Sequence, residues 1–180
     1  MLEHGDASQR AELVASFREQ AVHVMHTRDG ARIACGCLRH GDAKDRKAVL
    51  KAMKGYVSKA ALDPHGALVL SVALEAVDDT VLLSKSLLAE LQPELLGLSL
   101  HPHGNLPILQ VLAPRSKTHF SASQLDVMGD IDPAASKKDP AQRRTELLAT
   151  LLPAILKLSA AHAATLACSC LLYTSPSPRD

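Results

Sequence analysis

The 180-residue sequence has very few aromatic residues, which make up 2% of it: no tryptophan, two phenylalanines and two tyrosines. Leucine and alanine must therefore carry most of the 47% of residues that are hydrophobic. Both are strong helix formers, whereas the aromatic and β-branched residues that favour strands are scarce. The composition predicts one all-helical domain with a core of reasonable size.

Net charge is also nearly absent, at +1 at pH 7, which predicts no strong overall attraction to a polyanion. The charges are unevenly distributed, however. Residues 39–59 carry seven basic residues against two acidic ones, whereas residues 61–100 carry six acidic residues against Lys85 alone. A polyanion would therefore meet residues 39–59 first.

The sequence lacks the patterns of metal sites, enzymes and membrane proteins. Its four cysteines form two C-x-C pairs, Cys35/Cys37 and Cys168/Cys170, and not the C-x-x-C spacing of zinc sites. We expect reduced structural thiols, no metal or other cofactor, no catalytic activity and no small-molecule substrate, because no nucleophile or phosphate-loop motif occurs. Residues 147–172 are long and apolar but interrupted by Pro153, Lys157 and His162, so we expect a buried amphipathic helix and no membrane partner.

A short stretch recurs three times: 29-DGARIACGCL-38, 65-HGALVLSVAL-74 and 103-HGNLPILQVL-112. Gly30, Gly66 and Gly104 align at spacings of 36 and 38 residues, and a leucine follows each of them eight residues later. An amphipathic run of helical period precedes each copy. This period is typical of helical solenoids, in which each unit buries its apolar stripe against its neighbours. The sequence predicts an all-α solenoid with a glycine at each corner between helices.

The predicted units are about 8–43, 44–80 and 81–113, followed by a loop over 114–139 and the helices of an incomplete repeat over 140–167. Asp139 and Pro140 suit the N-cap and first position of the last helix, Pro153 is expected to kink it, and Pro107 requires its own helix to begin near Asn105. We expect residues 168–180 to be disordered. Their end, 171-LLYTSPSPRD-180, resembles a string found on unrelated translated transcripts; a native Ser-Pro tail is the alternative.

Several of these stretches resemble the Pumilio (PUF) repeat family. The segment 30-GARIACGCLRHG-41 is similar to the second helix of a Pumilio repeat, and the H-T-x-D-G-A-R and K-D-R-K blocks within residues 26–57 resemble the nucleolar Puf-A branch. Residues 68–80 and 137–148 are similar to the CPL region of that branch. The resemblance implies a right-handed superhelix that forms the C-terminal part of a longer array. It also implies binding to RNA or DNA, association with pre-ribosomal particles, and a role in ribosome biogenesis in the nucleus and nucleolus.

In Pumilio repeats, two or three side chains on the second helix of each repeat read one base. The matching positions here are Ala31, Arg32 and Cys35, then Ala67, Leu68 and Ser71, then Asn105, Leu106 and Leu109. Reading a base edge needs paired donors and acceptors, which these sets do not supply. Only Arg32 could stack on a base. The resemblance therefore implies contact with the nucleic-acid backbone and no base code.

The basic run offers a surface for such contact. Lys44, Lys47, Lys51 and Lys54, here called the lysine ridge, recur every three or four residues and so share one helix face, with Arg46 just off it. We expect the ridge and Arg46 to contact phosphates and Arg32 also to bind the nucleic acid; the alternative for the ridge is an ordinary solvated helix face. A second function also fits a solenoid: a protein-interaction scaffold that uses exposed apolar side chains such as Leu68 and Leu106.

Overall fold

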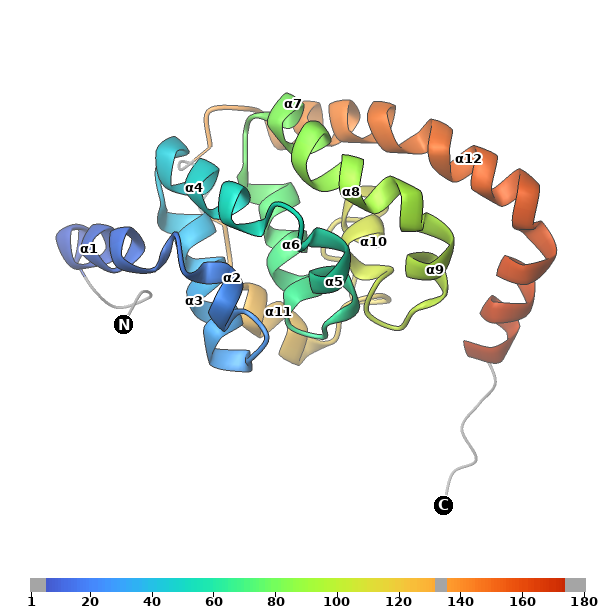
Figure 1. Cartoon of the computed structure of the whole chain (residues 1–180), viewed down its shortest axis with the longest axis horizontal. Coiled ribbons are helices and arrows are strands. Elements are labelled where there is room, and N and C mark those ends of the chain that lie inside the picture. The colour runs from blue at the N-terminus through green and yellow to red at the C-terminus, as the bar shows by residue number, and fades with distance from the viewer. Residues whose placement is uncertain (1–5, 132–135, 174–180) are drawn as a thin grey trace, which may run out of the picture.

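The computed structural model describes residues 6–131 and 136–173, and all secondary structure within these ranges is helical (Figure 1). The predicted all-α fold is confirmed there. The elements are α1 (Ala7–Phe17), α2 (Ala21–Val24), α3 (Arg28–His40), α4 (Ala43–Met53), α5 (Val57–Leu62), α6 (Gly66–Ala76), α7 (Thr80–Leu83), the π-helical turn η1 (Ser84–Leu88), α8 (Ala89–Leu91), the 3-10 turn η2 (Gln92–Glu94), α9 (Leu95–Leu100), α10 (Leu106–Leu112), α11 (Ala122–Met128) and α12 (Pro140–Tyr173).

The helices follow a repeating order of a long helix, a short helix and a second long helix. The first two groups are α1–α2–α3 and α4–α5–α6 (Figure 1). In the third group the first helix is divided into α7, η1 and α8, the short helix is α9 and the last helix is α10. The last helices of the groups lie side by side, with α6 between α3 and α10. The first helices form a second layer, in which α4 contacts η1, and η1 and α7 contact α12. The core runs continuously between these layers.

Each aligned glycine lies where two backbones come too close for a side chain. A Cβ atom on Gly30, Gly66 or Gly104 would lie 1.8, 2.5 or 3.0 Å from a backbone carbonyl oxygen. In every case that oxygen belongs to the residue six positions earlier: Val24, Ala60 and Leu98. None of the three glycines has a positive φ. Glycine is therefore required by close approach of the preceding short helix and not by a left-handed turn.

The residue three positions before each glycine holds the turn that leads into the last helix of its group. Thr27 Oγ1, Asp63 Oδ1 and His101 Nδ1 each accept a hydrogen bond from the backbone N–H of the aligned glycine, at 3.1, 2.7 and 3.1 Å. Each hydrogen bond satisfies a backbone donor at or just before the start of a helix, and Thr27 is the N-cap of α3 itself. Three chemically different residues thus accept the same hydrogen bond. Because their identities differ, this feature of the repeat cannot be recognised in the sequence.

The prediction that residues 114–139 form a loop is wrong in one respect, because they contain helix α11. The segment carries buried apolar side chains, Phe120 ahead of the helix and Val127 and Met128 within it. Helix α11 packs against both α3 and α6. Burial of these side chains fixes the segment against the last helices of the first two groups.

Helix α12 begins as predicted at Pro140, where Asp139 Oδ2 accepts a hydrogen bond 2.9 Å from Gln142 N. The expected break at Pro153 is displaced: the non-helical backbone lies at His162, with φ −129° and ψ 29°. The helix continues to Tyr173, so the prediction of disorder is wrong for residues 168–173. Residues 174–180, the rest of the predicted tail, lie outside the described part of the chain.

The stretch Pro140–Cys168 is long and apolar enough to cross a membrane by length and composition alone. Its first part packs on the domain, because Leu147 and Leu151 are buried and the helix contacts α7, η1, α9 and α10. Most residues from Leu156 to Cys168 are exposed. The expectation of a buried amphipathic helix is therefore correct only for the first part of α12.

Candidate nucleic-acid interface

Three lysines of the ridge, Lys44, Lys47 and Lys51, lie on α4, whereas Lys54 follows the helix as its C-cap, so the prediction of one shared helix face is wrong for Lys54. The orientation of α4 is fixed by its start and by its buried face. Asp42 caps the helix: its Oδ1 accepts hydrogen bonds from Lys44 N and Asp45 N at 2.7 and 2.8 Å. Val49, Leu50 and Met53 of α4 are fully buried. Lys44, Lys47 and Lys51 occur on the opposite face, and all four lysines of the ridge are exposed.

The four ammonium groups of the ridge are free to act on a ligand. Within residues 6–131 and 136–173, none of them takes part in an ion pair. Lys44 and Lys54 are ten residues apart, so at about 1.5 Å per residue the ridge is about 15 Å long. A strand of duplex DNA carries one phosphate per about 3.4 Å of helix axis, so the ridge matches about four phosphates of one strand.

The C-terminal end of the ridge is held by a carboxylate from the third group of helices. Glu90 of α8 accepts hydrogen bonds from Gly55 N at 2.8 Å and from Val57 N at 3.3 Å. Gly55, with φ +82°, provides the left-handed turn between α4 and α5. The backbone after Lys54 is thus fixed, although the lysine side chain itself is exposed.

Arg46 does not belong to this surface, and its prediction as a phosphate contact is wrong. The side chain is 5% exposed, and its guanidinium donates to the carbonyl oxygens of Leu38, Ala76 and Arg39 at 2.8, 2.7 and 3.2 Å. Three of its donors are therefore used to satisfy backbone acceptors at helix ends, where carbonyl groups lack partners within the helix.

The predicted base-reading positions are mostly inaccessible. Those that are buried are Ala31, Cys35, Ala67, Leu68, Ser71 and Leu106. Asn105 and Leu109 are partly buried, and Arg32 is exposed. Ser71 Oγ also donates to Ala67 O at 2.8 Å, within its own helix. The burial of Leu68 and Leu106 corrects the expectation that they form an exposed apolar groove for a protein partner.

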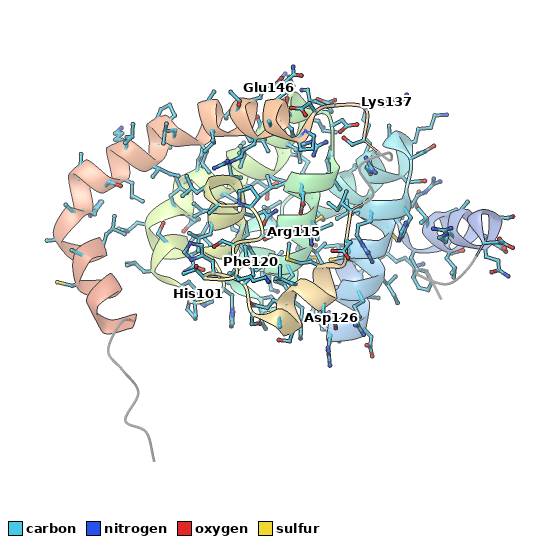
Figure 2. All side chains as sticks on the ribbon, turned by 180° about the vertical axis from the view of Figure 1, so that it is seen from behind. His101, Arg115, Phe120, Asp126, Lys137 and Glu146 are labelled. Atoms are coloured by element: carbon cyan, nitrogen blue, oxygen red, sulfur yellow. The ribbon has the colours of Figure 1, made fainter. Side chains whose placement is uncertain are left out.

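The segment 114–131 covers part of the last helices and is attached to them by polar contacts as well as by its apolar side chains (Figure 2). Arg115 Nε donates to both carboxylate oxygens of Glu75 at 2.8 and 2.9 Å, and Arg115 Nη2 donates to Gly129 O at 2.7 Å. Arg39 Nη1 donates to Asp130 O at 3.1 Å. Our sequence reasoning missed this cover; the signal was the apolar content of residues 120–131.

Arg32, the one predicted base-stacking side chain, is held by this cover. Its Nη2 lies 2.5 Å from Asp126 Oδ2, and Arg28 Nη2 lies 3.5 Å from the same oxygen. Asp126 belongs to α11. The acid therefore neutralises charge on the two arginines closest to the start of α3, and the structure does not bring Arg32 into the lysine ridge.

A pocket of about 580 Å³ lies between α2 and α5, beside the end of the ridge. His23 and His26 contribute to one side, and Tyr56 and Lys59 to the other. Our sequence reasoning did not single out Tyr56, although the stretch 54-KGYVSK-59 places an aromatic residue between two lysines.

The buried thiols show no sign of ligand chemistry. Burial raises the pKa of Cys35 to about 12 and that of Cys37 to about 11, so both remain protonated at neutral pH. Among the described residues, no group of three or more His, Cys, Asp or Glu side chains could hold a metal ion.

Comparison with known proteins places these features in a family. The family model of the CPL (NUC119) domain matches residues 100–172. The structure of human Puf-A in complex with DNA superposes with a TM-score of 0.86 at 34% identity, over 96% of this chain and 35% of that one. The chain belongs to the Puf-A branch of the Pumilio-repeat family. A second structure, of human Puf-A alone, gives a TM-score of 0.85 at 33% identity, with the same coverage.

Curated relatives agree with this assignment. The Puf-A-like chain is 39% identical to Pumilio homolog 3 of Danio rerio over 155 residues, which is 86% of this chain and 25% of that protein. It is 35% identical to Pumilio homology domain family member 6 of Schizosaccharomyces pombe over 161 residues, which is 87% of this chain and 25% of that protein. The chain thus spans about a quarter of the length of these relatives.

Proposed function

We propose that this chain binds nucleic acid through the phosphate backbone, with the lysine ridge as its principal contact surface. The observation that carries the proposal is a contrast. The positions that would read bases are almost all buried, whereas the four lysines of the ridge are exposed and, within the described residues, not ion-paired. Phosphate contacts position a protein on nucleic acid but carry no sequence information.

The comparisons support this proposal, because the superposed human Puf-A structure is a complex with DNA. We extend the proposal to RNA as the natural ligand and to a role in ribosome biogenesis on pre-ribosomal particles in the nucleolus. This extension depends on the family resemblance. A nucleolar signal from the tagged chain in cells would support the location, and exclusion from the nucleus would contradict it.

Salt-dependent binding to RNA tests the proposal directly. The whole chain is titrated into two unstructured RNAs of equal length and shuffled sequence, at several salt concentrations. We expect equal affinity for both, with log K falling by about 2 to 4 per tenfold rise in salt, as for three to five phosphate contacts on a single strand. A tenfold preference for one sequence would contradict backbone recognition.

Two triple variants with the same change of charge localise the contact. The first removes Lys47, Lys51 and Lys54 by substitution with alanine, and we expect it to flatten the salt slope by about 2. The control removes three exposed lysines from other surfaces: Lys117, Lys137 and Lys157. Equal losses in both triples would show that the ridge is not the contact surface. No binding by the folded chain at low salt would favour the scaffold alternative.

A further inference from the structure

The pocket between α2 and α5 combines an apolar floor with a polar rim that contains Lys59 and two histidines. Met25, Ala60 and Gly66 line it and are buried. Its volume of about 580 Å³ falls within the range of small-ligand sites. An apolar floor of this size suits a flat organic ring better than a hydrated ion.

The polar groups around the pocket favour a ligand with negative charge. His23, His26 and Lys59 line it and are exposed. The acid among the lining residues, Asp63, is already used: its Oδ1 accepts hydrogen bonds from the backbone N–H groups of His65 and Gly66 at 2.9 and 2.7 Å. The groups left for a ligand are therefore the Lys59 ammonium, which is a cation, and the two imidazoles, which can donate hydrogen bonds.

Tyr56 presents an exposed aromatic ring at this pocket on a fixed backbone. Its side chain is 53% exposed. The Tyr56 N–H donates to Met53 O at 2.9 Å, and the N–H groups of both its neighbours are held by Glu90. An aromatic ring on a rigid backbone is an efficient stacking surface, because little conformational freedom is lost on binding.

The Tyr56 ring lies between two lysines along the chain. A site that stacks a base needs such cations nearby to contact the phosphates on either side of that base. Lys54, the last residue of the lysine ridge, precedes Tyr56 by two positions, and Lys59 follows it by three on α5. Proteins that bind single strands combine such a basic track with aromatic side chains on which bases stack.

We propose that Tyr56 stacks on an unpaired base of single-stranded nucleic acid, which enters the α2–α5 pocket while the flanking phosphates contact Lys54 and Lys59. This inference depends on the proposed function and adds to it a preference for single strands. In a duplex the bases are already stacked and paired, and extruding one costs free energy. The site is made by the short helices and is separate from the base-reading positions of the last helices.

Substitutions at Tyr56 test the inference with the whole chain. Tyr56→Ala should weaken binding to an oligouridine by about 5- to 150-fold, the loss expected for one stacked base, and should leave binding to a duplex of the same length unchanged. Tyr56→Phe keeps the ring and should retain most of the affinity. Val81→Ala is the matched control, because Val81 is an exposed apolar residue on α7, away from the pocket.

Tyrosine fluorescence gives a second readout, because the chain has no tryptophan and only one other tyrosine, Tyr173. In a Tyr173→Phe variant the emission comes from Tyr56 alone. Oligouridine should quench it after correction for absorption with free tyrosine amide, and the duplex should not.

The outcomes separate this inference from the proposed function. Loss of single-strand affinity in Tyr56→Ala with intact duplex binding, together with quenching, supports the stacking site. If Tyr56→Ala binds like the unsubstituted chain, or if emission is not quenched, the stacking site is overturned while binding through the lysine ridge stands. If the folded, unsubstituted chain binds neither oligouridine nor duplex at low salt, both proposals are overturned.

Discussion

Arg46 Nη1 lies 2.7 Å from the carbonyl oxygen of Ala76 and so joins the end of α6 to the end of α3, where the same guanidinium contacts Leu38 and Arg39. Burial lowers the pKa of Arg46 from its ordinary value, and nearby Asp78 opposes that shift. A residue in the middle of a basic run is therefore part of the core that joins two units, while its neighbour Lys47 remains exposed.

Substitution of Arg46 should affect stability far more than nucleic-acid binding. Arg46→Ala leaves three buried carbonyl groups without their charged donor, and we expect a loss of about 2 to 4 kcal/mol in the free energy of unfolding. Lys47→Ala should change it by less than about 0.5 kcal/mol. Urea unfolding followed by circular dichroism measures both. Equal unfolding midpoints for the two variants would contradict the burial of Arg46.

The close approach at the aligned glycines predicts a graded response to alanine. Gly30→Ala should be the most damaging, because its Cβ would lie 1.8 Å from Val24 O, and Gly104→Ala the least, with its nearest atoms at 3.0 Å. Gly97, inside α9, is the control: a Cβ there meets nothing within 4 Å, so Gly97→Ala should stabilise by about 0.5 to 1 kcal/mol. Thermal unfolding of the three variants gives the order, and a Gly30→Ala chain as stable as Gly97→Ala would refute it.

Release of Arg32 from Asp126 should strengthen nucleic-acid binding. The pair is exposed, at 42% and 52%, so Asp126→Ala should cost less than about 1 kcal/mol of stability. The freed arginines should steepen the salt dependence of binding by about 0.7 for each one that reaches a phosphate. Asp130→Ala, the same charge change on the same segment, is the control. Adding Arg32→Ala to the Asp126→Ala chain should remove part of the gain in affinity. An equal gain in affinity for Asp126→Ala and Asp130→Ala would contradict the specific pairing of Asp126 with Arg32.

The buried thiols predict a loss of stability in alkali. Their pKa values are raised to about 12 for Cys35 and about 11 for Cys37, against about 8.5 in an unfolded chain. Below about pH 8 the thiols are protonated in both the folded and the unfolded chain, so their contribution to the free energy of unfolding is fully present. Between about pH 9 and 11 the unfolded chain loses protons that the native chain keeps, so stability falls by up to about 1.4 kcal/mol per pH unit for each thiol.

Unfolding measured at pH 7.5 and at pH 10 checks this expectation when the unsubstituted chain is compared with a Cys35→Ala, Cys37→Ala double variant. The double variant should be less stable at neutral pH but less sensitive to alkali. Iodoacetamide at pH 8 should label Cys168, which is exposed, and leave Cys35 and Cys37 unlabelled until the chain unfolds. Rapid labelling of Cys35 in the folded chain would contradict its burial.

The repeat and the lysine ridge could be predicted because both depend on residues close together in the chain. Apolar residues at helical spacing define a buried face, and Lys44, Lys47 and Lys51 fall on the opposite one. The glycine register was found from spacing alone, although its reason, a carbonyl oxygen six residues earlier, was seen only in the structure.

The sequence by itself determined an all-helical repeat of 36 to 38 residues, the exposed lysines of α4 and the absence of base-reading side chains, because helical period and side-chain chemistry are local properties. Only the tertiary structure decided that Arg46 is buried, that residues 114–131 cover the last helices, and that Tyr56 faces His23 and His26 across a pocket. These features come from contacts between residues about 30 to 98 positions apart, as between Arg46 and Ala76 or Arg28 and Asp126. No local pattern encodes such contacts, because packing of the whole chain selects them.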